Sequence, residues 1–240
     1  MLSVIIPVYN EFSTLPKLLN VLFLVPWPDG FVLEVIVVDD GSVDGTREWL
    51  IENEKTLGIK LFLHSKNKGK GAALRTGFNN ASGSVVIVQD ADLEYDPNEI
   101  IDVVTPIIKG NTKVCYGSRF LKQDQIIDSV DWVKKHRGSY FFAYIGGRTI
   151  THFCNFLFGS NLTDEPTCYK AFDKIFLDDI KLTSNGFELE PELTAKVLKR
   201  TTILEVPIHY YPRTYEEGKK VNWKDGVRAL WKLLKHRIVD

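Results

Sequence analysis

Short apolar runs alternate with amphipathic stretches along the first half of the chain. The runs are nearly continuous and rich in β-branched residues, and they cover residues 2–7, 33–38, 59–64 and 85–88. Such runs are typical of strands buried on both faces of a parallel sheet. The stretches between them predict helices over residues 14–23 and 45–56 and another that ends near residue 82. This alternation predicts an α/β fold, with a doubly wound, mostly parallel, Rossmann-like sheet flanked by helices.

The second half continues with helices expected at 97–109 and 189–199 and strands expected near 114–119 and 203–210. Two further segments combine aromatic and basic residues. Residues 132–158 predict two helical pieces broken near Gly146 and Gly147, and residues 223–238 predict one helix with an apolar stripe beside lysines and arginines. Such amphipathic appendages suit a membrane interface, and the first also suits an oligomer contact. Ordinary packing of both segments on the main domain explains the same patterns.

Polar side chains follow the predicted strands at their carboxyl ends. Tyr9 and Glu11 come after the first strand, and Asp39 and Asp40 come after the second. In an open parallel sheet, ligands bind beyond the carboxyl ends of the strands. We therefore expect these side chains to share one binding edge, and the paired aspartates indicate nucleotide binding.

The fourth strand is followed by an alternating acidic stretch, Asp90-Ala-Asp-Leu-Glu94. If the backbone stays extended, the three carboxylates point to one side and converge. Clustered carboxylates repel one another unless a cation lies between them, and hard oxygen ligands favour Mg²⁺ or Mn²⁺. The alternative is a solvated acidic turn before a helix that begins at Pro97.

Composition narrows the class of protein. The chain has 240 residues, 44% hydrophobic and 25% charged, which fits one large α/β domain. The net charge of −1 gives no overall positive potential of the kind that attracts nucleic acids. The three cysteines are widely spaced and form no CxxC motif, so we expect them to be reduced thiols. No uncharged run reaches the roughly 18–20 residues of a membrane span. We therefore expect a soluble or peripheral protein in the cytoplasm.

Glycine-rich and hydrolase motifs add little. Gly69 and Gly71 form an imperfect dinucleotide fingerprint after the third strand, which disfavours a Rossmann oxidoreductase. Lys68 and Lys70 in the same loop either reach a phosphate or lie in solvent. The sequence contains no P-loop, HExxH or GxSxG motif, so the simplest ATPase and hydrolase functions are excluded.

Seven short motifs occur in a fixed order along nearly the whole chain: Pro7-Val-Tyr-Asn-Glu11, Asp39-Asp-Gly-Ser-Val-Asp-Gly-Thr46, Asn67-Lys-Gly-Lys-Gly71, Asp90-Ala-Asp-Leu-Glu94, Gly117-Ser-Arg119, Phe187-Glu-Leu-Glu190 and Glu205-Val-Pro-Ile208. Together they resemble the family 2 glycosyltransferases with the GT-A fold, in the dolichyl- or polyprenyl-phosphate mannose synthase branch. The resemblance implies a GDP- or UDP-linked sugar as donor and a polyprenyl or dolichyl phosphate as acceptor. It also implies a peripheral position at the cytoplasmic face of a membrane.

The resemblance also assigns roles by motif position. The nucleotide would be held by Pro7, Tyr9, Glu11, Val38 and Asp40. The metal, Mg²⁺ or Mn²⁺, would be bound by Asp90, Asp92 and Glu94, with Ala91 beside the donor. Donor or acceptor phosphates would be bound by Arg119, Arg213 and Lys220, and the catalytic residues would be Asp92, Arg119 and Arg213.

Two features depart from the usual motifs of the branch. Glu94 stands where glutamine is frequent, and Cys168-Tyr-Lys170 replaces the usual Gly-Phe-Lys. Many members continue into C-terminal membrane helices, whereas this sequence resembles the soluble type. We expect one GT-A domain over residues 1–240, with a nucleotide-sugar half at 1–120 and an acceptor half at 121–240.

The acceptor decides whether a general base is needed. A phosphate monoester is already anionic at neutral pH, with a second pKa near ~6, so it requires only orientation and desolvation. A sugar hydroxyl would require a carboxylate base, for which Glu188 and Glu190 are the candidates. Two alternatives therefore remain beside hexose transfer to a lipid phosphate. They are a hydroxyl-acceptor enzyme of surface polysaccharide synthesis and a non-catalytic nucleotide-sugar-binding protein.

Overall fold

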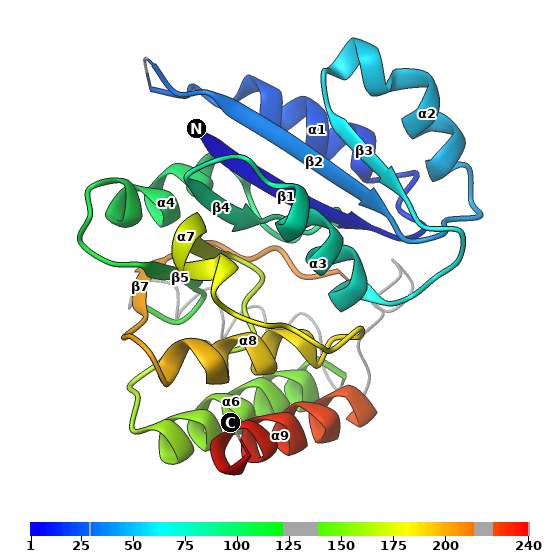
Figure 1. Cartoon of the computed structure of the whole chain (residues 1–240). Coiled ribbons are helices and arrows are strands. Elements are labelled where there is room, and N and C mark those ends of the chain that lie inside the picture. The colour runs from blue at the N-terminus through cyan, green and yellow to red at the C-terminus, as the bar shows by residue number, and fades with distance from the viewer. Residues whose placement is uncertain (29, 122–138, 214–222, 240) are drawn as a thin grey trace.

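A seven-stranded sheet organises the part of the chain that the computed structural model describes, residues 1–28, 30–121, 139–213 and 223–239 (Figure 1). The strands lie in the order β3-β2-β1-β4-β6-β5-β7. Their bounds are β1 Leu2–Val8, β2 Leu33–Asp39, β3 Lys60–Leu63, β4 Val85–Val88, β5 Val114–Ser118, β6 Lys170–Asp173 and β7 Leu204–Pro207. Each predicted strand is present within a few residues of its expected position.

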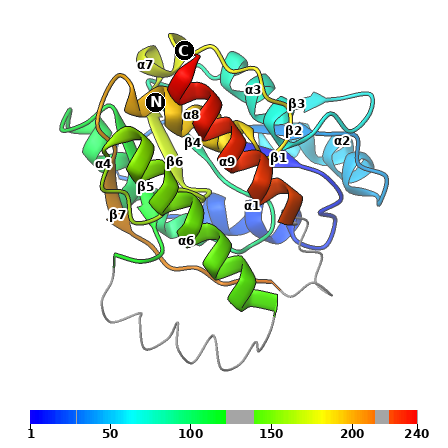
Figure 2. The ribbon, with the colours of Figure 1, turned by 90° about the horizontal axis from the view of Figure 1, so that it is seen from below.

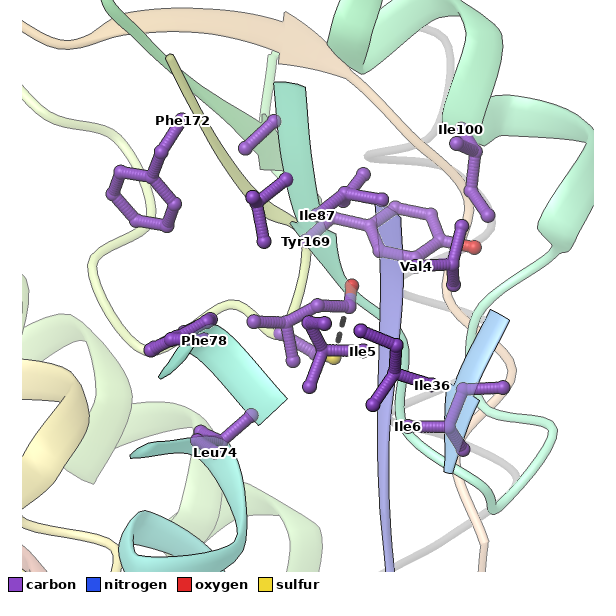
Figure 3. Packing of buried hydrophobic residues seen from close by; sticks show 14 of the residues in the cluster. Val4, Ile5, Ile6, Ile36, Leu74, Phe78, Ile87, Ile100, Tyr169 and Phe172 are labelled. Carbon is purple, nitrogen blue, oxygen red and sulfur yellow. Dashed lines mark hydrogen bonds between the residues drawn. The ribbon is translucent and has the colours of Figure 1, made fainter. Parts of the chain in front are cut away.

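The first four strands form the parallel half of the sheet. Strand β1 lies between β2 and β4, and Ile5 pairs with Ile36 on one side and Val88 on the other. Neighbouring residues of β1 face opposite sides of the sheet (Figure 3). Ile5 faces Leu74 and Phe78 of α3, whereas Val4 faces Ile100 of α4. Both faces are therefore covered, as the continuous apolar runs predict.

Helices connect the strands and flank the sheet. Their bounds are α1 Leu15–Leu24, α2 Thr46–Leu57, α3 Lys70–Asn80, the 3-10 turn η1 Pro97–Glu99, α4 Ile100–Ile108, α6 Ser139–Phe158, α7 Lys174–Asp178, α8 Leu189–Leu198 and α9 Trp223–Ile238. Local sequence sets several ends. Gly58 stops α2 with φ +64°, and the Asp96 side chain accepts from the Asn98 N–H where η1 begins.

Among the strands of the described residues, β6 is the one that the sequence pattern misses. It runs antiparallel to both β4 and β5, so the sheet is mixed rather than purely parallel. Only four residues long, β6 begins with a buried lysine, Lys170. A short strand that opens on a charged residue carries little periodic signal, and only its tertiary contacts reveal it.

Helix α6 corrects the predicted break at Gly146 and Gly147. The helix runs continuously from Ser139 to Phe158, and Thr151 donates to the Gly147 carbonyl within it. Each glycine costs about 1 kcal/mol relative to alanine, which packing against the domain offsets. The remainder of the predicted 132–158 segment, residues 132–138, lies outside the described residues.

Helices α6, α8 and α9 pack into a second layer below the sheet, with α6 and α9 side by side (Figure 2). Their shared core consists of Ile150, Cys154, Leu162, Ala195, Ala229 and Leu233. Phe153, Leu157 and Phe158 pack partly against it, whereas Phe156 is 83% exposed. The aromatic segment thus contributes both to the domain core and to an exposed apolar surface.

Candidate active site

The carboxyl ends of β1, β2 and β4 open into one cavity of about 890 Å³. Ten of the predicted site residues line it: Pro7, Tyr9, Glu11, Asp40, Asp90, Ala91, Asp92, Glu94, Arg119 and Arg213. Val38 does not line the cavity, because its side chain is fully buried in the sheet core. Lys220 lies outside the described residues. The parallel sheet therefore gathers motifs that are far apart in sequence, as the strand-end rule predicts.

Two loops at this edge hold each other in place. Asn10, with φ +53°, accepts from the Val43 N–H and donates its own N–H to Ser42. The Glu11 N–H donates to Thr46 Oγ1. Gly41 has φ +80°, and a Cβ there would lie 2.5 Å from the Lys66 carbonyl carbon. These constraints explain why the motifs after β1 and β2 combine asparagine, serine and glycine.

Asp39 and Asp40 have different surroundings. Asp39 is fully buried and pairs with Arg47 at 2.6 Å, so it serves the loop rather than the cavity. Asp40 lines the cavity, and its carboxylate also accepts from His64 Nδ1 at 2.6 Å and from the Gly69 N–H at 2.7 Å. Of the pair, only Asp40 is available to a ligand.

The acidic stretch after β4 is not extended. Strand β4 ends at Val88, and Leu93 has φ +64° within a turn. The expectation that strand alternation brings the three carboxylates together is therefore wrong. Each has its own partner: Asp90 pairs with Lys70 at 2.8 Å and Asp92 with Arg213 at 3.1 Å, while Glu94 accepts from Tyr210 at 2.9 Å.

The charges in this turn still act on one another. Burial raises the pKa of Asp92 to about 7, and the negative charges of Asp90 and Glu94 add to that rise while Arg213 opposes it. Within the described residues, no three acidic, histidine or cysteine side chains are arranged to hold a metal ion. The carboxylate oxygens of Asp90, Asp92 and Glu94 are nevertheless hard ligands that suit Mg²⁺ or Mn²⁺. A divalent cation would also relieve the repulsion among the three carboxylates.

Arg119 is held at the cavity wall by Asp164. Its Nε and Nη2 both lie 2.7 Å from the carboxylate, and Nη2 also donates to the Pro166 carbonyl at 3.1 Å. The guanidinium lies 4.9 Å from the Tyr210 ring centroid. This fork-to-carboxylate geometry fixes the arginine in one orientation. Sequence reasoning missed Asp164, because 45 residues separate it from Arg119 and no local motif marks it.

A partly buried charge network surrounds Asp90. Lys70 pairs with Asp90 and, at 2.7 Å, with Glu190. Lys170 donates to the Glu165 and Thr167 carbonyls, each at 2.9 Å, and lies 3.4 Å from Glu190. Burial would raise the pKa of Glu190, but the two lysines outweigh it and hold the pKa near 2. Glu190 is therefore an anion that neutralises the partly exposed Lys70 and the buried Lys170.

The part of the cavity between α6 and α9 is mostly apolar, although Thr149 and Asp225 also line it. Helix α6 contributes Gly146, Gly147 and Ile150, and helix α9 contributes residues that include Trp223, Val227 and Leu230. A Cβ built on Gly146 meets no atom within 4 Å, so the glycine leaves open space at this wall. The cavity thus joins a charged end, at the strand edge, to an apolar end between two amphipathic helices.

Exposed apolar side chains extend along α9. Trp223, Val227, Trp231 and Ile238 are each more than half exposed, beside Lys224, Arg228 and Lys235. Among the helices of the described residues, none is long and apolar enough to cross a bilayer.

Sequence comparison relates the chain to glycosyltransferases. Residues 3–180 match the sequence profile of glycosyl transferase family 2. Over 223 residues the chain is 30% identical to a dolichol-phosphate mannosyltransferase of Pyrococcus furiosus, an alignment that covers 90% of this chain and 58% of that protein. The chain thus spans little more than half the length of this relative.

Structure comparison gives the fold. Glucosyl-3-phosphoglycerate synthase from Mycobacterium tuberculosis, in complex with Mn²⁺, UDP and phosphoglyceric acid, is similar with a TM-score of 0.70 and 18% identity, over 100% of this chain and 79% of that one. Its complex with Mg²⁺ and UDP gives a TM-score of 0.69 at 19% identity, over 98% and 79% of the two chains. The likeness shows that this chain has the GT-A fold.

Proposed function

Because the chain belongs to glycosyl transferase family 2, we propose that it transfers a hexose from a nucleoside-diphosphate sugar to a polyprenyl or dolichyl phosphate. The observation that carries this proposal is the single cavity that joins the charged strand edge to the apolar wall of α6 and α9. The polar donor needs a charged site, and the hydrocarbon tail of the acceptor needs an apolar site beside it. The name of the Pyrococcus relative supports the same acceptor class.

The charged end is the proposed donor site. Asp40 and Glu11 offer carboxylate oxygens to base or ribose hydroxyls, and Tyr9 offers an aromatic wall. Lys70 lies within reach of a diphosphate that approaches Asp90. Val38 keeps its predicted role only through its backbone, since its side chain belongs to the core.

Asp90, Asp92 and Glu94 are the residues that would hold Mg²⁺ or Mn²⁺. The bound ion would supply Lewis-acid stabilisation of the charge on the departing nucleoside diphosphate. Lys70 and Arg213 balance Asp90 and Asp92, and they also pair with Glu190 and Glu11. A ligand at the acidic turn would replace the pairs with Asp90 and Asp92, and would let the two cations turn toward phosphate oxygens.

The acceptor is proposed to bring its own negative charge. Glu190 has its pKa held near 2, burial being outweighed by Lys70 and Lys170, so it is a poor proton acceptor at neutral pH. Glu188 is not among the described residues that line the cavity, and it accepts from the Gly186 N–H. The two carboxylates that are the candidate bases for a hydroxyl acceptor are thus poorly suited to general-base catalysis. A phosphate acceptor needs neither.

Arg119 and Arg213 are proposed to orient the acceptor phosphate. Asp164 already fixes Nε and Nη2 of Arg119, which leaves Nη1 for a phosphate oxygen. Attack of that oxygen on the anomeric carbon forms the new C–O bond as the bond to the nucleoside diphosphate breaks. This single displacement inverts the configuration. Lys220 keeps its predicted phosphate role as part of the proposal.

The apolar surface of α9 supports a position at the cytoplasmic face of a membrane, where a lipid phosphate is presented. Tryptophans beside lysines are the side chains that membrane interfaces favour. The alternatives are transfer to a hydroxyl acceptor and binding without catalysis, and the largely apolar wall of α6 and α9 favours the lipid phosphate over both.

Thermal unfolding with a panel of nucleotide sugars, with and without Mn²⁺, tests the donor site. We expect one GDP- or UDP-linked hexose to raise the melting temperature, and Mn²⁺ to increase that shift. The Asp92→Ala variant should lose both the Mn²⁺-dependent shift and turnover. Wild-type transfer by that variant would refute the role of the acidic turn.

A further inference from the structure

His64 lies behind the donor end of the cavity, just after β3. Its ring is 7% exposed and does not line the main cavity. Nδ1 lies 2.6 Å from Asp40 Oδ1, and Nε2 lies 2.9 Å from Thr76 Oγ1. An ionised carboxylate only accepts hydrogen bonds, so Nδ1 carries the proton of this contact. The imidazole is thus held from both sides, with its donor aimed at a cavity-lining carboxylate.

Asp40 also binds the loop that precedes helix α3. Its carboxylate also accepts from the Lys68 N–H at 2.9 Å and from the Gly69 N–H at 2.7 Å. The next residue, Lys70, places Nζ 2.8 Å from Asp90. One carboxylate therefore connects His64 to the loop that presents Lys70 to the charged end of the cavity.

The backbone around Asp40 packs closely against neighbouring segments. Gly69 has φ +100°, and a Cβ there would lie 2.4 Å from the Asn185 carbonyl oxygen. Gly41, next to Asp40, approaches the Lys66 backbone equally closely. The direction of the Asp40 carboxylate is set by the Lys68 and Gly69 N–H groups together with His64, which is its side-chain donor.

We propose that His64 is a positioning residue for the donor, acting through Asp40. This inference rests on the proposed function, since it takes the nucleotide of the donor sugar as the ligand of Asp40. The Nδ1–H bond holds the carboxylate toward the nucleotide and leaves an oxygen lone pair for it. His64 acts on donor affinity and not on the acceptor, because its contacts lie on the donor side of the sheet edge.

Two substitutions of similar size distinguish the hydrogen bond of Nδ1 from that of Nε2. In His64→Asn the amide nitrogen takes the place of Nδ1, whereas in His64→Gln it takes the place of Nε2. The probes are GDP and UDP, each with Mn²⁺, titrated by calorimetry. We expect His64→Gln to raise the Kd of the bound nucleotide about tenfold, the loss typical of a hydrogen bond to a charged group. His64→Asn should stay within about twofold of wild type.

Steady-state kinetics and melting temperatures distinguish positioning from a merely structural role. The KM of the nucleotide sugar should rise in His64→Gln while the KM of polyprenyl phosphate stays unchanged. Both variants should melt at similar temperatures, because each loses one ring contact. Thr76→Val, which leaves the Nδ1 contact in place, should bind nucleotide within about twofold of wild type.

Equal Kd values for the asparagine and glutamine variants would overturn the positioning role while leaving the proposed function intact. A tenfold loss in Thr76→Val would also overturn it, because the important contact would then be at Nε2. If folded wild-type protein binds neither GDP nor UDP, the proposed function fails and this inference fails with it.

Discussion

Arg119 and Asp164 form the most constrained ion pair at the cavity. Two 2.7 Å contacts join them, and the Asp164 side chain is fully buried. Lysine keeps the charge of arginine but cannot form the two-pronged contact. We expect Arg119→Lys to lower the free energy of unfolding by about 2–4 kcal/mol and to reduce kcat. Urea unfolding measures the first effect, and Arg228→Lys, at an arginine that is 64% exposed and pairs with Asp225 at 3.4 Å, is the control.

Glu192, on helix α8, makes the stability of the protein depend on pH. Burial would raise the pKa of Glu192, but hydrogen bonds from Ser184 and Lys196 outweigh it and lower the pKa from 4.5 to about 2. A group whose folded-state pKa is depressed stabilises the protein above its unfolded pKa, and that stabilisation is lost as pH falls through the folded pKa. The shift corresponds to about 3 kcal/mol at neutral pH.

Unfolding measured between about pH 7 and pH 2 therefore separates wild type from Glu192→Gln. Wild type should lose stability from near pH 5 downward. The variant should be less stable at pH 7 and should show a shallower decline across the same window. Parallel curves for the two proteins would contradict the assignment of this effect to Glu192.

At the scale of elements, helix α6 uses its glycines to form a cavity wall. Gly146 lines the cavity with open space beside it, so leucine at this position would project a side chain into the apolar end. We expect Gly146→Leu to raise the KM of the lipid acceptor several-fold without changing donor affinity. The melting temperature should hold or rise, since leucine favours helix by up to about 1 kcal/mol over glycine.

The matched control for that change is His152→Leu, at an exposed position of the same helix. It adds the same side chain away from the cavity and should leave both KM values unchanged. Unchanged lipid KM in Gly146→Leu would show that the acceptor does not pass along this wall.

Helix α9 carries the proposed membrane contact. Trp231 is 63% exposed on the apolar stripe, so its replacement removes little packing. We expect Trp231→Glu to reduce sedimentation with anionic lipid vesicles several-fold, while the melting temperature stays within a few degrees. Ile175→Glu on α7, where Ile175 is 79% exposed, is the control and should bind vesicles like wild type. Equal loss in both variants would indicate a non-specific effect of charge.

At the scale of the whole molecule, the sequence predicts what is local or repeated. Continuous apolar runs predict β1 to β4 and their shared edge, because both faces of a parallel sheet must be apolar. Motif order predicts which residues line the cavity. Features that depend on tertiary packing are not predicted from the sequence. They are the antiparallel strand β6, the Arg119–Asp164 ion pair, the His64–Asp40 hydrogen bond, and the continuity of helix α6 across Gly146 and Gly147.

The acidic turn shows both the strength and the limit of such reasoning. Its residue types correctly indicate a charged site at the end of β4. The expected geometry is wrong, because alternation implies convergence only while the backbone stays extended, and Leu93 breaks it with positive φ. Pairing with Lys70 and Arg213, residues distant in sequence, then decides where each carboxylate lies.

Transfer of a labelled hexose to polyprenyl phosphate, compared with polyprenol of the same chain length, tests the central claim most directly. The two acceptors share one hydrocarbon tail and differ only in the phosphate that Arg119 and Arg213 are proposed to bind. We predict that mass spectrometry detects polyprenyl-phosphate hexose and no glycosylated polyprenol. Equal transfer to polyprenol, or transfer to a sugar hydroxyl with none to the lipid phosphate, would contradict the account.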